Sequence, residues 1–278
     1  MEPLKRVFTE SIIRDYQTAS TPLLVLGDDY NQYVVKSGQG KYPAYYLISE
    51  FLSYYLLKLW GIPTPEAVVI TVDPEDIEQA IYDKKIASLH KKHFYKNICF
   101  GSSLIARPLE MQQFFDTKDL KSSYLLNPET FLKIALFDIW IENEDRKPTN
   151  YNLLAKLSGN KYELYAIDHS FTFATLNYGD LNPKNGVTKT VNDCILYCEF
   201  AKKLCKQYQR AKRDIRKEME EYFYLCREES VKNFDLIAAQ IPHELGINEH
   251  LIDSLKAFLF NEDRNQVVLQ EFRLRLIV

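Results

Sequence analysis

The sequence predicts an α+β protein with a small mixed first part and a mostly helical second part. Short β-type runs surround one long apolar helix within the first hundred residues, and the pattern beyond Asn192 is helical to the end. A second hairpin pattern lies between these regions, near position 160. Because the character of the chain changes after Pro108, we expect two parts, over 1–107 and 108–278, as one two-lobed domain or two small domains.

The first part begins with a predicted hairpin. Residues 22–26 and 32–36 are β-type runs joined by a segment rich in Gly, Asp and Asn. The run from Ala44 to Trp60 is strongly apolar, lacks Gly and Pro and stops at Gly61, which is typical of a helix with a glycine C-terminal signal. The other elements expected here are a strand over 67–72, a partly helical polar segment over 73–97 and a short apolar run over 98–105.

The second part opens with a helix signal. The segment 127–129, Asn-Pro-Glu, offers an N-cap, a proline at the first helical position and an early acid, and the apolar run 131–141 follows. Residues 151–157 and 161–167 then predict a hairpin that places Asp168 at the end of its second strand. Breaks in the later helical pattern are expected near Pro242, Gly246 and Asn261.

Composition excludes several classes of protein. With 278 residues, of which 46% are hydrophobic and 26% charged, the chain can bury a substantial core. A formal charge of −3 argues against direct nucleic-acid binding. We expect a cytoplasmic protein without membrane contact, since there is no secretory signal pattern and no apolar stretch near the roughly 20 residues of a membrane span. The five cysteines are expected to be reduced thiols, because their number is odd.

The segment from Asn143 to Asp168 carries the most informative side chains. Asp145 is followed five residues later by Asn150, and Asp168 ends the next apolar strand. Metal-assisted phosphoryl transfer needs such groups: one carboxylate for the acceptor hydroxyl and two oxygen ligands for Mg²⁺. We therefore interpret the chain as an ATP-dependent kinase.

The same Asp-x-x-x-x-Asn spacing occurs twice more, starting at Asp138 and at Asp180, so spacing alone is weak evidence. Asp138 lies inside an apolar helical run, where it and Asn143 are expected to point apart. Asp180 lies in a loop rich in Gly, Asn and Pro, and no apolar strand ending in Asp follows it. Only Asp145 has the whole arrangement.

A phosphate-binding lysine is expected in the first part. Lys36 ends the second predicted strand, a position from which an ammonium can reach the α- and β-phosphates of ATP. Glu50 is the only acidic residue of the long apolar helix, where a lone carboxylate is costly unless it is paired. We expect the two to pair. The alternatives are a solvated charge at Lys36 and a solvent-facing stripe that joins Glu50 to Ser49 and Ser53.

Two further segments are assigned to the nucleotide. The segment 18–21, Thr-Ala-Ser-Thr, precedes the first predicted strand, and its short residues can present backbone N–H groups to phosphate oxygens. We predict that Ser20 or Thr21 contacts ATP or is itself phosphorylated; the alternative is an ordinary polar loop. The segment 100–105, which contains Ser102, is assigned to the adenine pocket from its order in the chain.

These motifs resemble those of the HipA-like kinases and, more distantly, the phosphatidylinositol kinases. The resemblance rests on Asn143-x-Asp145-Arg146-x-x-x-Asn150, Ile167-Asp168-His169 and Tyr33-Val34-Val35-Lys36. It implies a two-lobed protein-kinase-like fold with a small N-lobe, a mostly helical C-lobe, and ATP and Mg²⁺ in the cleft. By position, it implies that Asp145 activates the acceptor and that Asn150 and Asp168 are metal ligands. It also implies that Lys36 binds phosphate and that Glu50 is the partner of Lys36.

Lys147 resembles the lysine of the Asp-Leu-Lys-Pro-Glu-Asn loop of ordinary protein kinases, which touches the transferring phosphate, whereas HipA-like sequences often have histidine there. A permanent cation suits a transition state whose negative charge spreads over equatorial oxygens. The chain also departs from the pattern of protein kinases. Asp168-His169-Ser170 replaces Asp-Phe-Gly, and no Gly-x-Gly-x-x-Gly precedes the first strand. His169 is expected to orient Asp168 or to pack in the cleft.

The resemblance implies a protein Ser or Thr as the phosphate acceptor. A small-molecule or lipid kinase is one alternative, and a catalytically silent nucleotide-binding toxin or interaction module is another. Some HipA-like kinases are accompanied by a small DNA-binding or antitoxin-like partner, so such a partner is a further implication. The basic segment from Lys202 to Lys217 is expected to be a helix with a solvated charged face.

Overall fold

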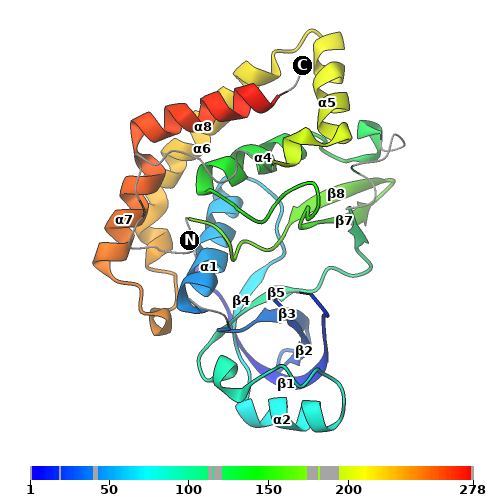
Figure 1. Cartoon of the computed structure of the whole chain (residues 1–278), viewed down its shortest axis with the longest axis vertical. Coiled ribbons are helices and arrows are strands. Elements are labelled where there is room, and N and C mark those ends of the chain that lie inside the picture. Colours follow the sequence, from blue (N-terminus) through cyan, green and yellow to red (C-terminus); the bar gives the residue numbers. More distant parts are fainter. Residues whose placement is uncertain are drawn as a thin grey trace.

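Five strands of the first part close into a barrel in the computed structural model of the chain (Figure 1). The structure describes residues 2–18, 20–39, 43–111, 115, 121–173, 181 and 194–276. Neighbouring strands are antiparallel except β1 and β4, whose parallel pairing closes the barrel. Around the barrel the order is β1 (Arg6–Asp15), β2 (Leu23–Gly27), β3 (Gln32–Lys36), β5 (Cys99–Ser103) and β4 (Ala67–Thr71).

The sequence does not predict β1, although the strands paired with it are confirmed within one or two residues. Only Val7 and Ile12 of this strand are buried, and their separation of five residues breaks the alternation that marks a half-buried strand. The pairing register with β2 shifts between Thr9 and Ser11 and again after Ile12. Because such irregularities change which face successive side chains occupy, they hide the strand from pattern analysis.

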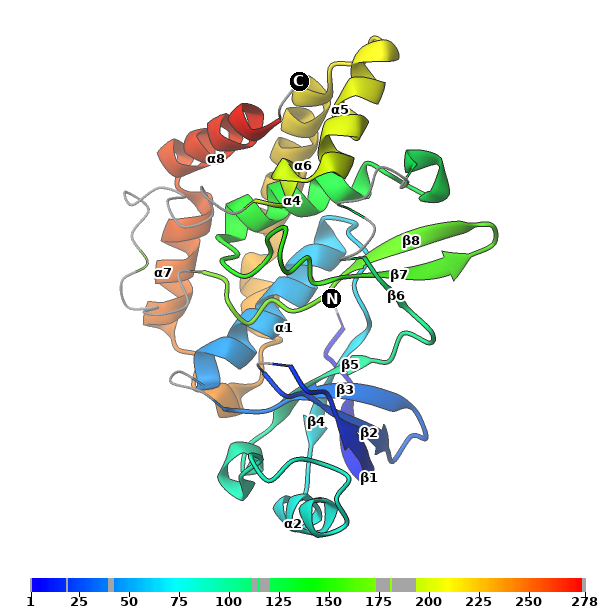
Figure 2. The ribbon, with the colours of Figure 1, turned by 45° about the vertical axis from the view of Figure 1, so that its right-hand side comes forward.

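Helix α1 (Pro43–Leu59) lies between the barrel and the helices of the second part (Figures 1 and 2). It ends where the sequence predicts, because Gly61 has a φ of 61°, a left-handed conformation that glycine adopts without a Cβ penalty. Trp60 stacks on Trp140 with 4.8 Å between ring centroids, and its indole nitrogen donates to Ser230 at 3.1 Å. These contacts anchor α1 to the core of the second part.

Helix α4 (Thr130–Ile141) is buried along almost its whole length, as expected for a helix that is apolar all round. The predicted N-cap at Asn127 is wrong, because the helix begins at Thr130 with Glu129 as its uncapped N-terminal neighbour. The backbone N–H of Thr130 bonds instead to the carbonyl of Asn127, so a separate turn precedes the helix.

The hairpin predicted after α4 is present as β7 (Leu153–Ser158) and β8 (Lys161–Ala166). Its first strand begins at Leu153 rather than at residue 151. The short strand β6 (Leu109–Glu110) pairs with β7, and the three strands form an antiparallel sheet beside α4 (Figure 2). Asp168 follows the end of β8, as the sequence predicts.

Four helices form the last part of the chain, which are α5 (Glu199–Arg210), α6 (Ile215–Ala238), α7 (Glu249–Phe260) and α8 (Glu262–Arg275). The predicted breaks near Pro242, Gly246 and Asn261 are confirmed. The basic segment from Lys202 to Lys217 is not one helix, because Asp214 caps a new helix by accepting from the backbone N–H of Arg216 at 3.1 Å. The shorter helices are α2 (Pro74–Tyr82), η1 (Lys92–Tyr95), η2 (Ser122–Tyr124), η5 (Ile195–Tyr197) and η6 (His243–Leu245).

No helix within the described ranges is long and apolar enough to cross a membrane. All five cysteines are buried as thiols outside any disulfide, in agreement with the prediction of reduced thiols.

A buried chain of polar contacts ties the segment between β4 and β5 to the barrel. His90 is 1% exposed, with Nδ1 2.7 Å from the hydroxyl of Tyr95 and Nε2 3.2 Å from Oδ2 of Asp15. The same carboxylate oxygen accepts from the backbone N–H of Ala87 at 2.8 Å. Because Asp15 ends β1, these contacts hold the base of the loop that leads to β2.

Replacing His90 by leucine is expected to lower the free energy of unfolding by about 2–4 kcal/mol, since the Tyr95 hydroxyl and the Asp15 carboxylate lose a buried partner. Equilibrium urea unfolding measures this change. His93→Leu, at an exposed position of η1, is the matched control and should stay within about 0.5 kcal/mol of the wild type. Equal stability of the two variants would contradict the role given to His90.

Candidate active site

The loop that carries Asp145 is built on the end of α4. Glu142 has a φ of 55°, in the left-handed region, and reverses the chain there. The side-chain nitrogen of Asn143 then donates back to Oδ1 of Asp138 at 2.9 Å. Its oxygen accepts from the backbone N–H groups of Asp145 and Arg146 at 3.1 and 3.3 Å. The expectation that Asp138 and Asn143 point apart is therefore wrong, because it assumed that the helix continues through position 143.

The buried guanidinium of Arg146 joins this loop to the β7–β8 hairpin. Nη1 donates to the carbonyl of Tyr151 at 2.9 Å and also to that of Asn152. Nη2 donates to the carbonyl of Ile167 at 3.0 Å and lies 2.8 Å from Nε2 of His169. The start of β7, the end of β8 and the loop are therefore held by one side chain.

Asp138 is the counter-ion of Arg146, with its Oδ2 2.8 Å from Nε. Burial raises the pKa of Asp138, and the Arg146 guanidinium and the Asn143 amide partly offset this effect. A buried charge is costly unless it is paired and hydrogen-bonded, and this arrangement satisfies both requirements for Arg146. The ion pair also connects the loop to the middle of α4.

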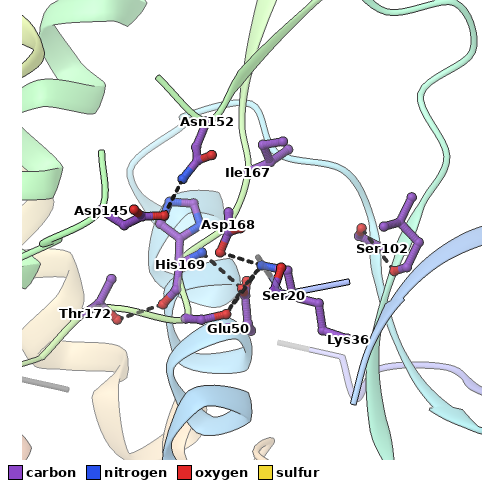
Figure 3. A network of polar contacts seen from close by, with 12 residues as sticks. Ser20, Lys36, Glu50, Ser102, Asp145, Asn152, Ile167, Asp168, His169 and Thr172 are labelled. Atoms are coloured by element: carbon purple, nitrogen blue, oxygen red, sulfur yellow. Dashed lines mark hydrogen bonds and ion pairs between the residues drawn. The ribbon is translucent and has the colours of Figure 1, made fainter. Parts of the chain in front are cut away.

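Asp145 is partly exposed, and two amides hold one of its carboxylate oxygens. Oδ2 accepts from the side-chain nitrogens of Asn150 and Asn152, each at 3.0 Å. Figure 3 shows the contact with Asn152. Asn150 is held in turn by two backbone hydrogen bonds with Lys147, at 2.8 and 3.0 Å. The Asp-x-x-x-x-Asn motif thus brings its two side chains into direct contact.

Lys36, Glu50 and Asp168 converge in the close-up of Figure 3. The Lys36 ammonium lies 2.5 Å from Oε1 of Glu50 and 2.5 Å from Oδ1 of Asp168. Glu50 also accepts from the hydroxyl of Ser170 at 2.7 Å and from the backbone N–H of His169 at 3.1 Å. Residues from β3, from α1 and from the segment after β8 therefore share one charge cluster.

The expected pairing of Lys36 with Glu50 is present, and both alternatives to it are wrong. The Lys36 side chain is only 15% exposed, so it is not a solvated strand-end charge. Glu50 does not lie on a solvent stripe, since Ser49 and Ser53 are completely buried. The α1 face that carries these polar residues is buried. Because a buried carboxylate is costly without a counter-ion, Glu50 requires a cation as its partner.

Opposing effects set the pKa values in this cluster. Burial raises the pKa of Asp168, but the neighbouring Lys36 ammonium outweighs it, so that the net pKa lies below the usual range of an aspartate. Burial lowers the pKa of Lys36, and the two carboxylates outweigh this effect and raise it. Both groups are therefore charged at neutral pH. Burial, assisted by the charges of Arg146 and Lys36, lowers the pKa of His169 well below its usual value, which leaves a neutral ring.

Backbone hydrogen bonds join the Asp145 loop to the segment after Asp168. The N–H of Glu144 donates to the carbonyl of Phe171 at 2.9 Å, and the N–H of Phe173 donates to the carbonyl of Ile141 at 2.8 Å. Asp168 itself has a φ of 60°, which is uncommon for a non-glycine residue. The two carboxylate-bearing segments therefore run side by side.

Ser20, Thr21 and Ser102, which the sequence assigns to the nucleotide, form no hydrogen bond with the charge cluster around Lys36 in the described part of the chain. Ser20 and Thr21 lie in the turn between β1 and β2, where the side chain of Gln39 donates to the Ser20 carbonyl. This contact ties the turn to the segment that follows Lys36. Ser102 lies on β5, its hydroxyl donates to the carbonyl of Val34 at 3.4 Å, and Figure 3 shows it apart from the ion cluster.

Several residues of the site have roles that the sequence reasoning did not assign. Arg146 belongs to the quoted motif, but the carbonyl groups that it binds leave no mark in a sequence. In the sequence Ser170 is only a departure from Asp-Phe-Gly, but its hydroxyl reaches Glu50 at 2.7 Å and lies 3.3 Å from the Lys36 ammonium. Asn152 falls within a predicted strand, and its one sequence signal is that it is a second asparagine close to Asn150.

The donor set at this site suits a hard divalent cation. Asp168 is 23% exposed and ionised, and the amide of Asn150 turns its nitrogen to Asp145, which leaves its oxygen as an acceptor. Carboxylate and amide oxygens are ligands that Mg²⁺ accepts, usually together with waters and substrate phosphates. The oxygens of Asp168 and Asn150 therefore fit a Mg²⁺ ion that is also held by phosphates. Among the described residues, no three or more His, Cys, Asp or Glu side chains are grouped to hold a metal ion.

Comparisons with known proteins identify a family and a similar fold. A family model described as HipA-like kinase matches residues 9–250. The solved structure of the Helicobacter pylori proinflammatory kinase CtkA has a TM-score of 0.50 at 12% sequence identity, and the match covers 92% of this chain and 94% of that chain. At this identity the likeness concerns the fold alone.

Two structures of the Golgi casein kinase are also similar. The first has a TM-score of 0.42 at 12% identity and covers 100% of this chain and 74% of that chain. The second, with Mn/ADP bound, has a TM-score of 0.40 at 10% identity and covers 100% and 75%. Among curated proteins, none matches the sequence.

The neutral state of His169 predicts a pH dependence of stability. The unfolded chain takes up a proton at this residue below its ordinary pKa of about 6.5, whereas the folded chain does not, so stability falls as the pH drops below that value. The slope from one such group is at most about 1.4 kcal/mol per pH unit. Urea unfolding at pH 7.5 and 5.5 should show a smaller loss for His169→Gln than for the wild type. Identical losses would contradict the assignment.

Proposed function

The chain belongs to the HipA-like kinase family, and we propose that it transfers the γ-phosphate of ATP to a hydroxyl in a Mg²⁺-dependent reaction. The observation that carries this proposal is the contact of Lys36 with both Glu50 and Asp168, at 2.5 Å each. A largely buried cation shared by two carboxylates, one of them partly exposed, contributes little to stability by itself. It is well suited to a site where phosphates and a divalent cation bind.

In this proposal the two parts of the chain act as the lobes of a kinase, with 1–107 as the N-lobe and 108–278 as the C-lobe. Lys36 and Glu50 come from the barrel and α1, whereas Asp145 and Asp168 come from the second part. The nucleotide would lie where these segments meet, which agrees with the convergence of the charged groups there. The likeness in fold to a bacterial kinase supports the same division.

Asn150 and Asp168 are the proposed ligands of Mg²⁺. When bound, the ion would neutralise negative charge on the phosphates, which is the main contribution of a metal ion to phosphoryl transfer. The lowered pKa of Asp168 keeps this carboxylate ionised and therefore able to hold a cation. Lys36 binds the nucleotide phosphates through its ammonium, and Glu50 keeps that ammonium in place.

Asp145 is the proposed catalytic residue. The acceptor oxygen forms a bond to the γ-phosphorus while the bond from that phosphorus to the β–γ bridging oxygen breaks and ADP leaves. The proton of the acceptor hydroxyl passes to Asp145, whose carboxylate is partly exposed and accepts hydrogen bonds through Oδ2. Lys147 lies two residues further along and supplies positive charge for the transferring group.

Further assignments concern the rest of the nucleotide and the acceptor. Ser20 and Thr21, in the turn tied to Gln39, are proposed to contact the phosphates, and Ser102 on β5 marks the adenine side. The proposed acceptor is a Ser or Thr hydroxyl of a protein, an assignment that rests on the family. Main-chain and hydroxyl donors of the β1–β2 turn are of the kind that bind phosphate oxygens.

Asp145→Ala is expected to reduce phosphate transfer at least about 100-fold while nucleotide affinity changes little, because a positioned general base contributes to the transition state. The measurement is transfer of labelled γ-phosphate from ATP and Mg²⁺ to cell-lysate proteins, with nucleotide binding measured on the same preparations. Asp253→Ala, which removes an exposed carboxylate of α7, is the matched control and should retain full activity.

The outcomes of this assay separate the proposed function from its competitors. Label recovered in protein Ser or Thr that disappears in Asp145→Ala supports the proposal. Transfer only to small molecules would replace the protein acceptor by a metabolite or lipid. Nucleotide binding without transfer or hydrolysis in the wild type would mean a silent nucleotide-binding module.

A further inference from the structure

Asp145 has two amide partners, and the recognised motif accounts for only one of them. Asn150 belongs to the Asp-x-x-x-x-Asn motif, whereas Asn152 lies beyond it. Both side-chain nitrogens donate to the same oxygen, Oδ2 of Asp145, at 3.0 Å. The Asp145 oxygen accepts both hydrogen bonds, so the atom of each amide that faces it is the nitrogen. The geometry therefore gives Asn152 a donor role at the proposed catalytic carboxylate.

The backbone of Asn152 holds its side chain in place. Its φ of 46° lies in the left-handed region, which asparagine tolerates better than most residues other than glycine. Its carbonyl accepts from the guanidinium of Arg146 and from the backbone N–H of Ile167 at 3.1 Å. The residue is thus anchored between the loop and the end of β8, directly before β7 begins. A side chain on so constrained a backbone is suited to orient a neighbour.

The shared contact has a chemical consequence for Asp145. With two donors on Oδ2, the carboxylate cannot rotate freely, and Oδ1 is the oxygen left to take the acceptor hydroxyl. In phosphate transfer, much of the rate enhancement comes from positioning, and this includes the orientation of the catalytic base. Asn150 cannot orient the Asp145 carboxylate alone if its oxygen also binds the metal ion, because the ion would draw its amide in another direction. Asn152 is not a proposed metal ligand.

We propose that Asn152 is a positioning residue that sets the orientation of the Asp145 carboxylate for phosphate transfer. The inference rests on the proposed function, in which Asp145 receives the proton of the acceptor. It separates the two asparagines, because Asn150 serves the metal ion as well as Asp145, whereas Asn152 serves only Asp145.

Two substitutions test this role without relying on a single fold-sensitive variant. Asn152→Gly removes the amide and keeps the left-handed backbone free of strain. Asn152→Asp keeps the size of the side chain but replaces the donor by an acceptor that repels Asp145. Both should lower kcat about 10- to 100-fold, the equivalent of one hydrogen bond to a charged group, and leave the KM for ATP and the Mg²⁺ requirement unchanged. Asn150→Gly, as the comparison, should raise the Mg²⁺ concentration needed for half-maximal activity.

The kinetic pattern distinguishes failure of this inference from failure of the proposed function. An active wild type together with unchanged kcat in both Asn152 variants would overturn the inference alone. Equal changes in kcat, KM for ATP and Mg²⁺ requirement would also overturn it, since they would indicate a general structural role. A wild type that transfers no phosphate to any acceptor would overturn the proposed function and this inference with it.

Discussion

The charge of Lys36, shared by Glu50 and Asp168, is the interaction on which the organisation of the molecule depends. Strand β3, helix α1 and the distant segment after β8 meet at this ammonium, with both carboxylates at 2.5 Å. Glu50 is 3% exposed on an apolar helix, so its burial requires a partner, and Lys36 can meet that need only if β3 and α1 pack as they do. Asp168 then brings the second part of the chain to the same point.

A second buried cation, Arg146, gives the site its internal geometry. Its guanidinium binds backbone carbonyls at the start of β7 and the end of β8, and it pairs with Asp138 of α4. The loop that carries Asp145 and the strand end that carries Asp168 are therefore held by one rigid group. The Lys36 side chain is 15% exposed, whereas that of Arg146 is fully buried. This difference matches their proposed roles in binding and in support.

The parts of the fold that have local signals could be predicted from the sequence, and the parts that depend on distant partners could not. Helix α1 has a glycine stop at Gly61, and the hairpin that precedes Asp168 has alternating residues around a turn. Strand β1 has no such signal, because shifts in its register break the alternation. The contact between Asp138 and Asn143 depends on the left-handed Glu142, which ends the helix before Asn143 and which the sequence pattern does not indicate. Carbonyl acceptors, such as those of Arg146, have no sequence signature.

Calorimetric titration of ADP with and without Mg²⁺ measures whether the Lys36, Glu50 and Asp168 cluster binds a nucleotide together with the ion. The titrations are made on the wild type, on Asp168→Asn and on Asp253→Asn as the control. Mg²⁺ is expected to strengthen ADP binding in the wild type and in the control but to have little effect in Asp168→Asn. The same affinity with and without Mg²⁺ in the wild type, or an undiminished Mg²⁺ effect in Asp168→Asn, would rule out this role of the cluster.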